Sequence, residues 1–209
     1  MPGADGGNPN GHEVRSRLST KLLLEAAGDL VAEGGYSSLT LAMVGQRAGY
    51  SSGLATARFR TKAKLLEALV DRIVDRWQIT TLMPQVAGAS GLEAFTVIVH
   101  SIREQYVRDP RSLRVLTALI FEALGSTTEL NARFTALHRD LRAGIAGAVE
   151  LGITDGSVRP DVDAALEAGL TVAVLRGVGY QWRLDPEDYD PAPTLDHFLA
   201  VTVERIRAK

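Results

Sequence analysis

The sequence predicts an all-α protein, because apolar residues recur three or four positions apart along most of the chain. No segment shows the alternating apolar and polar residues of a β-strand, and glycine and proline clusters separate the helical stretches. The chain has 209 residues, of which 45% are hydrophobic, so it can bury a full core and still carry one small additional domain. The expected architecture is a small helical domain followed by a larger helical body.

The chain is expected to begin with a flexible tail over residues 1–14, because this glycine-rich stretch has too little apolar surface to join a core. A first helix should start near Arg15 and stop at the double glycine Gly34 and Gly35. The apolar face of this helix would consist of Leu18, Leu22, Leu23, Ala26, Ala27, Leu30 and Val31.

Two short helices are expected next. Thr40 is placed to cap a helix over residues 41–48, which ends at Gly49. Ser51 is placed to cap a second short helix over residues 52–58. The sequence therefore predicts a pair of short helices joined by a turn that contains glycine.

The rest of the chain continues the helical pattern in longer segments. Thr61 is placed to cap a longer helix that runs to Trp77. We expect one domain over residues 15–76 and a second over residues 77–209. The helices expected in the second domain cover residues 92–109, 113–124, 130–149, 162–182 and 194–207.

The apolar residues of the segment over residues 162–182 leave it almost no polar face, so as a helix it must be buried on more than one side. In a domain of this size a second subunit is needed to cover the second side, and we expect a homodimer. The last helix can pack beside this segment and complete a four-helix bundle between two subunits. The residues expected at the interface are Leu170, Val174, Val178, Phe198 and Thr202.

The formal net charge of −2 conceals a basic patch. Residues 1–77 carry a net charge of +2, whereas the remainder carries −4. The window from Arg47 to Lys64 contains five lysines and arginines and no acidic residue. Such a window suits the phosphates of a nucleic acid, although charge alone fits a solvated surface equally well.

The two short helices, their turn and the flanking arginines match the pattern of a helix-turn-helix. We expect the second helix to enter a major groove, where Ser52, Thr56 and Arg58 reach base edges or phosphates. Lys62 would bind one phosphate near the start of the next helix. The alternative is a helical hairpin without a ligand, against which the basic window argues. The full set expected at DNA is Thr40, Arg47, Ser51, Ser52, Gly53, Thr56, Ala57, Arg58, Arg60 and Lys62.

The segment AGYSSGLATARFRTKAKLL, residues 48–66, resembles the turn, the recognition helix and the start of the fourth helix in the tetracycline-repressor (TetR) family of bacterial regulators. The resemblance extends over residues 23–70. Two positions depart from the family pattern. Thr56 replaces the usual tyrosine of the recognition helix, so an aromatic contact to DNA is lost. Gly45 replaces an alanine, which we expect only to loosen local packing by up to about 1 kcal/mol.

The resemblance also implies a ligand pocket among the middle helices of the body. An apolar cavity with a few polar groups would suit a small molecule, although residues of this kind more often belong to an ordinary core. The residues expected to line the pocket are Phe95, Ile102, Thr117, Phe121, Phe134 and His138.

These observations predict a homodimeric, sequence-specific DNA-binding regulator, by default a repressor that a small apolar or amphipathic effector releases from its operator. The alternative is a dimeric helical protein-interaction module without specific DNA binding. An enzyme is not expected, because no acid, base and nucleophile converge in a motif.

Several other sites are not expected in this chain. The four histidines lie in separate elements without a second ligand at metal-binding spacing, so we predict no metal. The pair Gly177 and Gly179 follows no strand, so we predict no dinucleotide cofactor. The absence of cysteine and of an apolar run of about 20 residues favours a cytoplasmic protein that does not associate with a membrane.

Overall fold

A computed structural model of the chain describes residues 11–125 and 128–208. Over these residues the chain forms helices and no β-strand, which confirms the all-α class. One isolated β-bridge in the same part of the chain joins Val158 to Arg207. None of the described helices combines the length and the apolar character needed to cross a membrane. The chain divides into two compact units, Met1–Leu69 and Val70–Lys209.

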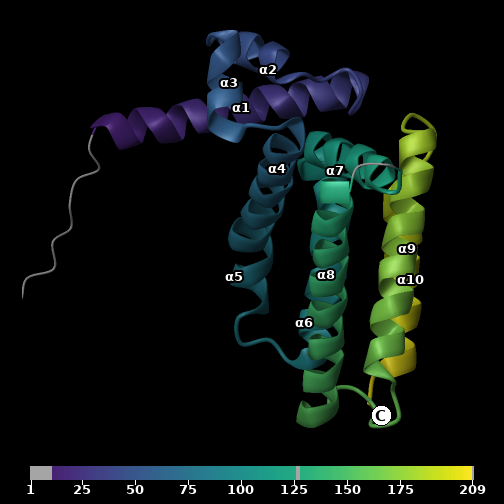
Figure 1. Cartoon of the computed structure of the whole chain (residues 1–209). Coiled ribbons are helices and arrows are strands. Elements are labelled where there is room, and N and C mark those ends of the chain that lie inside the picture. Colours follow the sequence, from purple (N-terminus) through teal and green to yellow (C-terminus); the bar gives the residue numbers. More distant parts are fainter. Residues whose placement is uncertain (1–10, 126–127, 209) are drawn as a thin grey trace, which may run out of the picture. The chain divides into compact units, whose positions relative to one another are not determined.

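The first unit contains α1 (Gly11–Gly34), α2 (Leu41–Arg47), α3 (Ser52–Phe59) and the first half of α4 (Lys62–Trp77), which continues into the second unit (Figure 1). Gly35 and Gly49 follow α1 and α2 with positive φ angles of 73° and 77°, a conformation that favours glycine. The core of this unit consists of Leu23, Leu24, Ala27, Leu30, Val31, Leu39, Val44, Ala55, Leu65 and Leu66.

The helix α1 starts at Gly11, four residues before the expected start near Arg15. The prediction of a tail over residues 1–14 is therefore wrong for residues 11–14, while residues 1–10 lie outside the described part. The guanidinium of Arg15 supports the additional turn, because its Nε donates to the carbonyl oxygen of Gly11 at 3.1 Å. Glu13 adds a carboxylate to the first turn, where the helix dipole favours negative charge.

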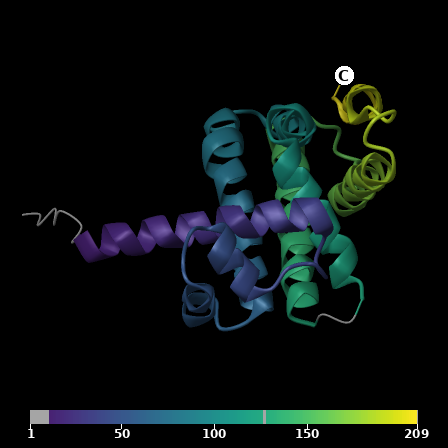
Figure 2. The same ribbon diagram turned by 90° about the horizontal axis from the view of Figure 1, so that it is seen from above.

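The second unit begins with the end of α4 and continues through a π-helical turn, η1 (Gln78–Leu82), and the short α5 (Met83–Val86). The longer helices of this unit are α6 (Gly91–Arg108), α7 (Pro110–Ala123), α8 (Thr128–Asp155), α9 (Ala164–Leu184) and α10 (Pro191–Ile206). Within the unit, α8 packs against α6, α7 and α9, and α9 and α10 lie side by side (Figures 1 and 2).

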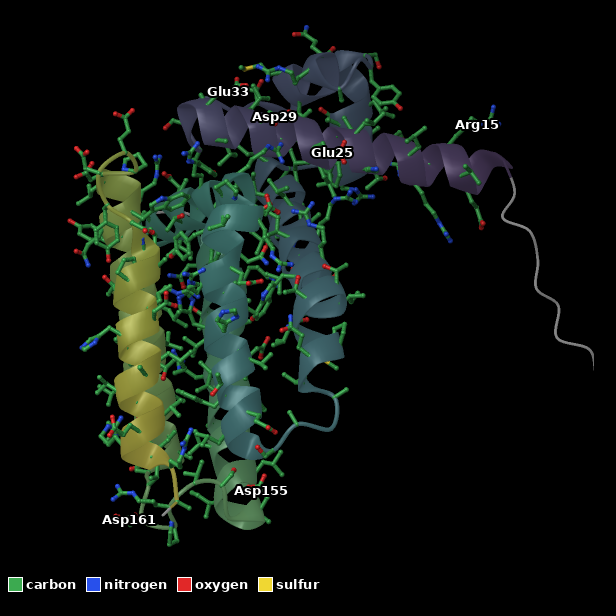
Figure 3. All side chains as sticks on the ribbon, turned by 180° about the vertical axis from the view of Figure 1, so that it is seen from behind. Arg15, Glu25, Asp29, Glu33, Asp155 and Asp161 are labelled. Atoms are coloured by element: carbon green, nitrogen blue, oxygen red, sulfur yellow. The ribbon has the colours of Figure 1, made fainter. Side chains whose placement is uncertain are left out.

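The helices α6 and α8 cross at two glycines. A Cβ atom added to Gly91 would lie 1.9 Å from the backbone nitrogen of Gly152, so the two backbones touch there. The carboxylate of Asp155, labelled in Figure 3, accepts a 2.7 Å hydrogen bond from the Gly91 N–H and so caps α6 from the end of α8. Ser90 and Glu93 add a capping box at the same terminus. The crossing holds the N-terminus of α6 against the C-terminal end of α8.

Candidate functional site

The two short helices of the first unit are in unusually close contact. A Cβ atom added to Gly45 of α2 would lie 2.6 Å from the backbone oxygen of Ser51 and 3.2 Å from Cα of Ser52, at the start of α3. The expectation that this glycine only loosens packing is wrong, because an alanine here would collide with the backbone of the turn. Gly45 thus allows α3 to approach α2 closely.

The caps of these helices follow the expectation in two of three cases. Thr40 accepts a hydrogen bond from the Met43 N–H at 3.2 Å, and Thr61 accepts one from the Lys64 N–H at 3.1 Å. Ser51 occupies the N-cap position of α3, but its side chain makes no capping hydrogen bond and is exposed. Its hydroxyl group therefore faces solvent at the N-terminus of α3.

The helix α3 presents small side chains to solvent. Ser52, Gly53, Thr56 and Ala57 are exposed, whereas Ala55 is fully buried against the rest of the unit. A helix with such a slim exposed face fits the width of a major groove. Five of the residues predicted to meet DNA, Ser51 to Gly53 with Thr56 and Ala57, therefore lie together on one exposed surface, which we call the α3 face.

Arg58 is directed away from the role predicted for it. Its Nη1 donates to Ser16 Oγ at 2.8 Å and to Thr20 Oγ1 at 2.7 Å, and its Nη2 donates to Ser19 Oγ at 3.2 Å. All three hydroxyl groups belong to α1, so the guanidinium joins α3 to α1 within the first unit. These contacts indicate that Arg58 positions α3, while its expected contact with base edges stays a prediction.

Arg47 forms a two-pronged ion pair with Glu33 on α1, with N–O distances of 2.8 and 2.9 Å. The paired carboxylate raises the pKa of Arg47, and the guanidinium lowers the pKa of Glu33. Asp29 lies one turn before Glu33, and both are labelled along α1 in Figure 3. Both partners of the pair are exposed, so the pair is weak and can exchange for a phosphate.

The last two predicted cations flank the end of α3. Arg60 is exposed and has a positive φ of 65° at the C-terminus of α3. Lys62 lies at the start of α4 with its ammonium 3.7 Å from the ring centroid of Tyr36, a cation–π contact. Arg47, Arg58 and Lys62 are thus held by contacts inside the unit, and the exposed α3 face carries no charged residue.

The second unit contains a cavity of about 610 Å³ between α6, α7, α8 and α9. Five of the six residues predicted for a pocket line it, namely Ile102, Thr117, Phe121, Phe134 and His138. The sixth, Phe95, does not, because it is fully buried in the core between α6 and α8. A second cavity of about 350 Å³ adjoins α4, η1 and α6 to α8, and Ile102, Leu113, Leu116, Leu141 and Arg176 line both cavities.

Arg176 of α9 holds the central polar position between the cavities. Its Nε donates to His138 Nε2 at 2.8 Å, and His138 Nδ1 lies 2.7 Å from the carbonyl oxygen of Phe134. The two contacts together place the imidazole proton on Nδ1 and leave Nε2 as an acceptor. Desolvation, followed by the charge of Arg176, lowers the pKa of His138, so the imidazole is neutral.

Sequence reasoning missed Arg176 and Tyr106. Tyr106 lies on α6, and burial raises its pKa to about 12, so it remains a hydroxyl donor. A signal for Arg176 was present, because it is the lone charged residue between Glu167 and Arg183 in an otherwise apolar helix. In terms of periodicity such a residue is only a break in the apolar pattern, whereas a cation drawn partly into the interior of a small domain indicates a site.

The helices α9 and α10 carry the residues predicted for a dimer interface, but these do not share one surface. Val178 and Thr202 are buried inside their own chain, Val174 and Phe198 are partly buried, and Leu170 is exposed. The prediction is wrong for Val178 and Thr202, because the sequence did not reveal which side of α9 faces its own core. The exposed apolar residues of α9 instead form a stripe, which we call the α9 stripe. It consists of Leu166, Leu170, Ala173, Gly177, Tyr180 and Leu184.

The described residues provide no group of three metal-binding side chains. A tight pair of short helices with a slim exposed second helix defines the first unit as a helix-turn-helix, the motif with which DNA-binding regulators enter a major groove.

A sequence model of bacterial regulatory proteins of the tetR family matches residues 23–69, and a model of the C-terminal part of BetI-type transcriptional repressors matches residues 93–207. The chain therefore belongs to the TetR family of bacterial transcriptional regulators. No curated protein sequence matches the chain.

Solved structures of the family share the fold. SmeT, the repressor of the Stenotrophomonas maltophilia multidrug efflux pump SmeDEF, is 23% identical with a TM-score of 0.74 over 91% of each chain. FadR from Bacillus subtilis in complex with stearoyl-CoA is 18% identical with a TM-score of 0.77, over 90% of this chain and 99% of that one. A TetR-family regulator from Agrobacterium tumefaciens is 20% identical with a TM-score of 0.76, over 92% of this chain and 99% of that one.

Proposed function

We propose that this TetR-family regulator is a repressor that reads its operator with the α3 face. The observation that carries the proposal is the exposure of Ser51, Ser52, Gly53, Thr56 and Ala57 on one slim surface. Their hydroxyl and methyl groups suit base edges and phosphates. Because Thr56 replaces an aromatic residue of the family pattern, the operator of this protein differs from those of relatives that have the tyrosine.

The cations around the α3 face supply the phosphate contacts. Arg47 and Arg60 are exposed, and the ion pair of Arg47 with Glu33 is at the surface, where exchange for a phosphate costs little. Lys62 lies in the first turn of α4, where the helix dipole also favours a phosphate. These contacts set the register of the protein on DNA, and the α3 face reads the sequence.

Two copies of the chain associate through α9 and α10. The α9 stripe supports this proposal, because its residues are spaced alternately by four and three positions and lie exposed along the whole helix. An apolar stripe of this length is unfavourable in water, and a second copy covers it in a symmetric interface. A dimer presents two α3 helices to a roughly palindromic operator.

The cavities of the second unit hold the effector. Their combined lining is apolar with a few polar groups, and the larger cavity falls within the usual size of ligand sites in proteins. The FadR structure with stearoyl-CoA indicates that this fold accepts a ligand in a relative. The effector lowers operator affinity by binding more tightly to the conformation that does not fit DNA.

Selection of binding sites from random duplex DNA at moderate salt tests the proposal. We expect a single enriched sequence with two inverted half-sites about one helical turn apart, centre to centre. A protein-interaction module would enrich no sequence. Failure to enrich any sequence would remove the basis for a repressor.

A further inference from the structure

The larger cavity contains a partly buried cation, Arg176, that has no acidic partner among the described residues. Arg176 makes no ion pair within residues 11–125 and 128–208, and its Nε donates a hydrogen bond to the neutral His138. The two terminal nitrogens of its guanidinium, which carry four N–H donors, remain for another acceptor. Desolvation lowers the pKa of Arg176, and the sole charge effect that opposes it comes from Tyr106.

The lining of this cavity is cationic. Its charged residues are Arg176 and Arg142, and the described lining residues include no aspartate or glutamate. The second cavity differs, because Asp75, Asp140 and Arg133 line it. Arg176 therefore lies between the second cavity, whose lining includes acidic residues, and the larger cavity, whose described lining does not.

Tyr106 adds a second donor to the same place. Its hydroxyl oxygen lies 3.4 Å from the position that a Cβ of Gly179 would occupy, so it reaches the backbone of α9 less than one turn from Arg176. The high pKa of Tyr106 keeps the proton on this oxygen. The remaining lining is apolar and aromatic, with Phe121 and Tyr180 in edge-to-face contact 5.7 Å apart at one end.

From this arrangement we propose that the effector is an amphipathic acid, whose carboxylate binds Arg176 and the Tyr106 hydroxyl and whose apolar body fills the larger cavity. The inference rests on the proposed function, since it names the ligand class of that cavity. Removing a guanidinium from water without an acceptor is unfavourable, and a carboxylate restores two parallel N–H to oxygen bonds. A neutral or cationic amphipath lacks this compensation.

His138 acts as a positioning residue for this site. By accepting from Nε, its neutral ring turns the guanidinium so that the terminal nitrogens are available to the ligand. A protonated ring would lose the acceptor and add a second positive charge beside Arg176. The carbonyl oxygen of Phe134 holds the ring in the orientation that this role requires.

The test compares acids with alcohols of the same shape. Binding of decanoate, decanol, naphthoate and naphthylmethanol to the full chain is measured by titration calorimetry in the absence of DNA. We expect at least one acid to bind about ten- to a hundredfold more tightly than its alcohol. Equal binding of acid and alcohol in both pairs, or no binding of either acid, would overturn the proposal.

Two variants locate the contact. In Arg176→Met the preference for the acid should disappear, with the alcohol unaffected, while Arg139→Met should behave as wild type because Arg139 is exposed and lines neither cavity. A preserved preference in a folded Arg176→Met protein would contradict the assignment. Should that variant not fold, the wild-type comparison of acid and alcohol still decides the question.

The outcomes separate this inference from the proposed function. Acid binding is measured without DNA, so a protein that enriches no operator can still prefer the acid. Conversely, a protein that selects an operator and binds acid and alcohol alike retains the DNA-binding proposal and loses the ligand class.

Discussion

Arg176 Nε donates a 2.8 Å hydrogen bond to His138 Nε2, and this contact requires the histidine to be neutral. Burial and the neighbouring guanidinium lower the pKa of His138 from its ordinary value of 6.5. Protonation of His138 would break this bond, so the stability of the folded protein depends on pH. The lowered pKa of His138 sets the direction of that dependence.

The first prediction concerns this pH dependence. Below about pH 6.5 the unfolded chain takes up a proton at residue 138 while the folded chain does not, so acid favours unfolding. Above that pH the histidine is neutral in both states and contributes no slope. We expect the wild type to lose stability relative to His138→Gln as the pH falls, because glutamine accepts from Arg176 without titrating. Thermal unfolding of both proteins at a series of pH values provides the measurement, and parallel curves would refute the linkage.

The second prediction concerns the contact of α2 with α3. Gly45→Ala should destabilise the protein by about 1–3 kcal/mol, because the new methyl group would overlap the Ser51 carbonyl oxygen. The gain in helix propensity from glycine to alanine is too small to offset this overlap. Gly53→Ala is the matched control, since nothing lies within 4 Å of a Cβ there, and it should be neutral or stabilising. Urea unfolding compares the two. Similar effects for both variants would show that no close approach exists at Gly45.

A third prediction separates positioning from reading in α3. Arg58→Met removes the hydrogen bonds to Ser16, Ser19 and Thr20, so it should weaken binding to all DNA sequences alike and lower the melting temperature. Thr56→Ala should leave stability unchanged and alter the selected sequence at one position in each half-site. The check is site selection together with thermal unfolding for each variant. A changed sequence preference in Arg58→Met would restore its role at the bases.

The fourth prediction concerns the dimer. Leu170→Glu places a charge in the middle of the α9 stripe and should convert a dimer into a monomer at micromolar concentration. Val107→Glu is the control, because Val107 is exposed on α6 outside the stripe and its change should leave the dimer intact. Sedimentation velocity measures both. A wild type that is already monomeric, or a dimer that persists in Leu170→Glu, would exclude the interface.

Periodicity and capping residues predicted much of the fold. The regular spacing of leucines and alanines gave α1, and Thr40 and Gly49 bracketed α2 correctly, because these signals act within a few residues of the chain. The side of a helix that meets its own core is a tertiary property. For that reason the apolar segment around Val178 was recognised as buried, but its buried and exposed faces were not distinguished.

The direction of a long side chain is equally hidden from the sequence. Arg58 lies in the basic window, yet serine and threonine hydroxyls about 40 positions earlier in the chain determine where its guanidinium points. Five of the six residues predicted for the pocket, chosen as apolar side chains with a few polar ones, line the larger cavity. The sixth, Phe95, belongs to the core at the α6–α8 crossing. The choice between core and cavity depends on how closely two backbones approach, which Gly91 and Gly152 control here.

The proposed function depends on sequence-specific recognition of DNA by the α3 face. The direct measurement is the ratio of dissociation constants for a shuffled duplex and for the selected duplex of equal length, taken by fluorescence anisotropy at physiological salt. We expect the selected duplex to bind about a thousandfold or more tightly than the shuffled one. Equal affinities, falling together as salt rises, would reduce the contact to phosphate attraction and contradict the claim.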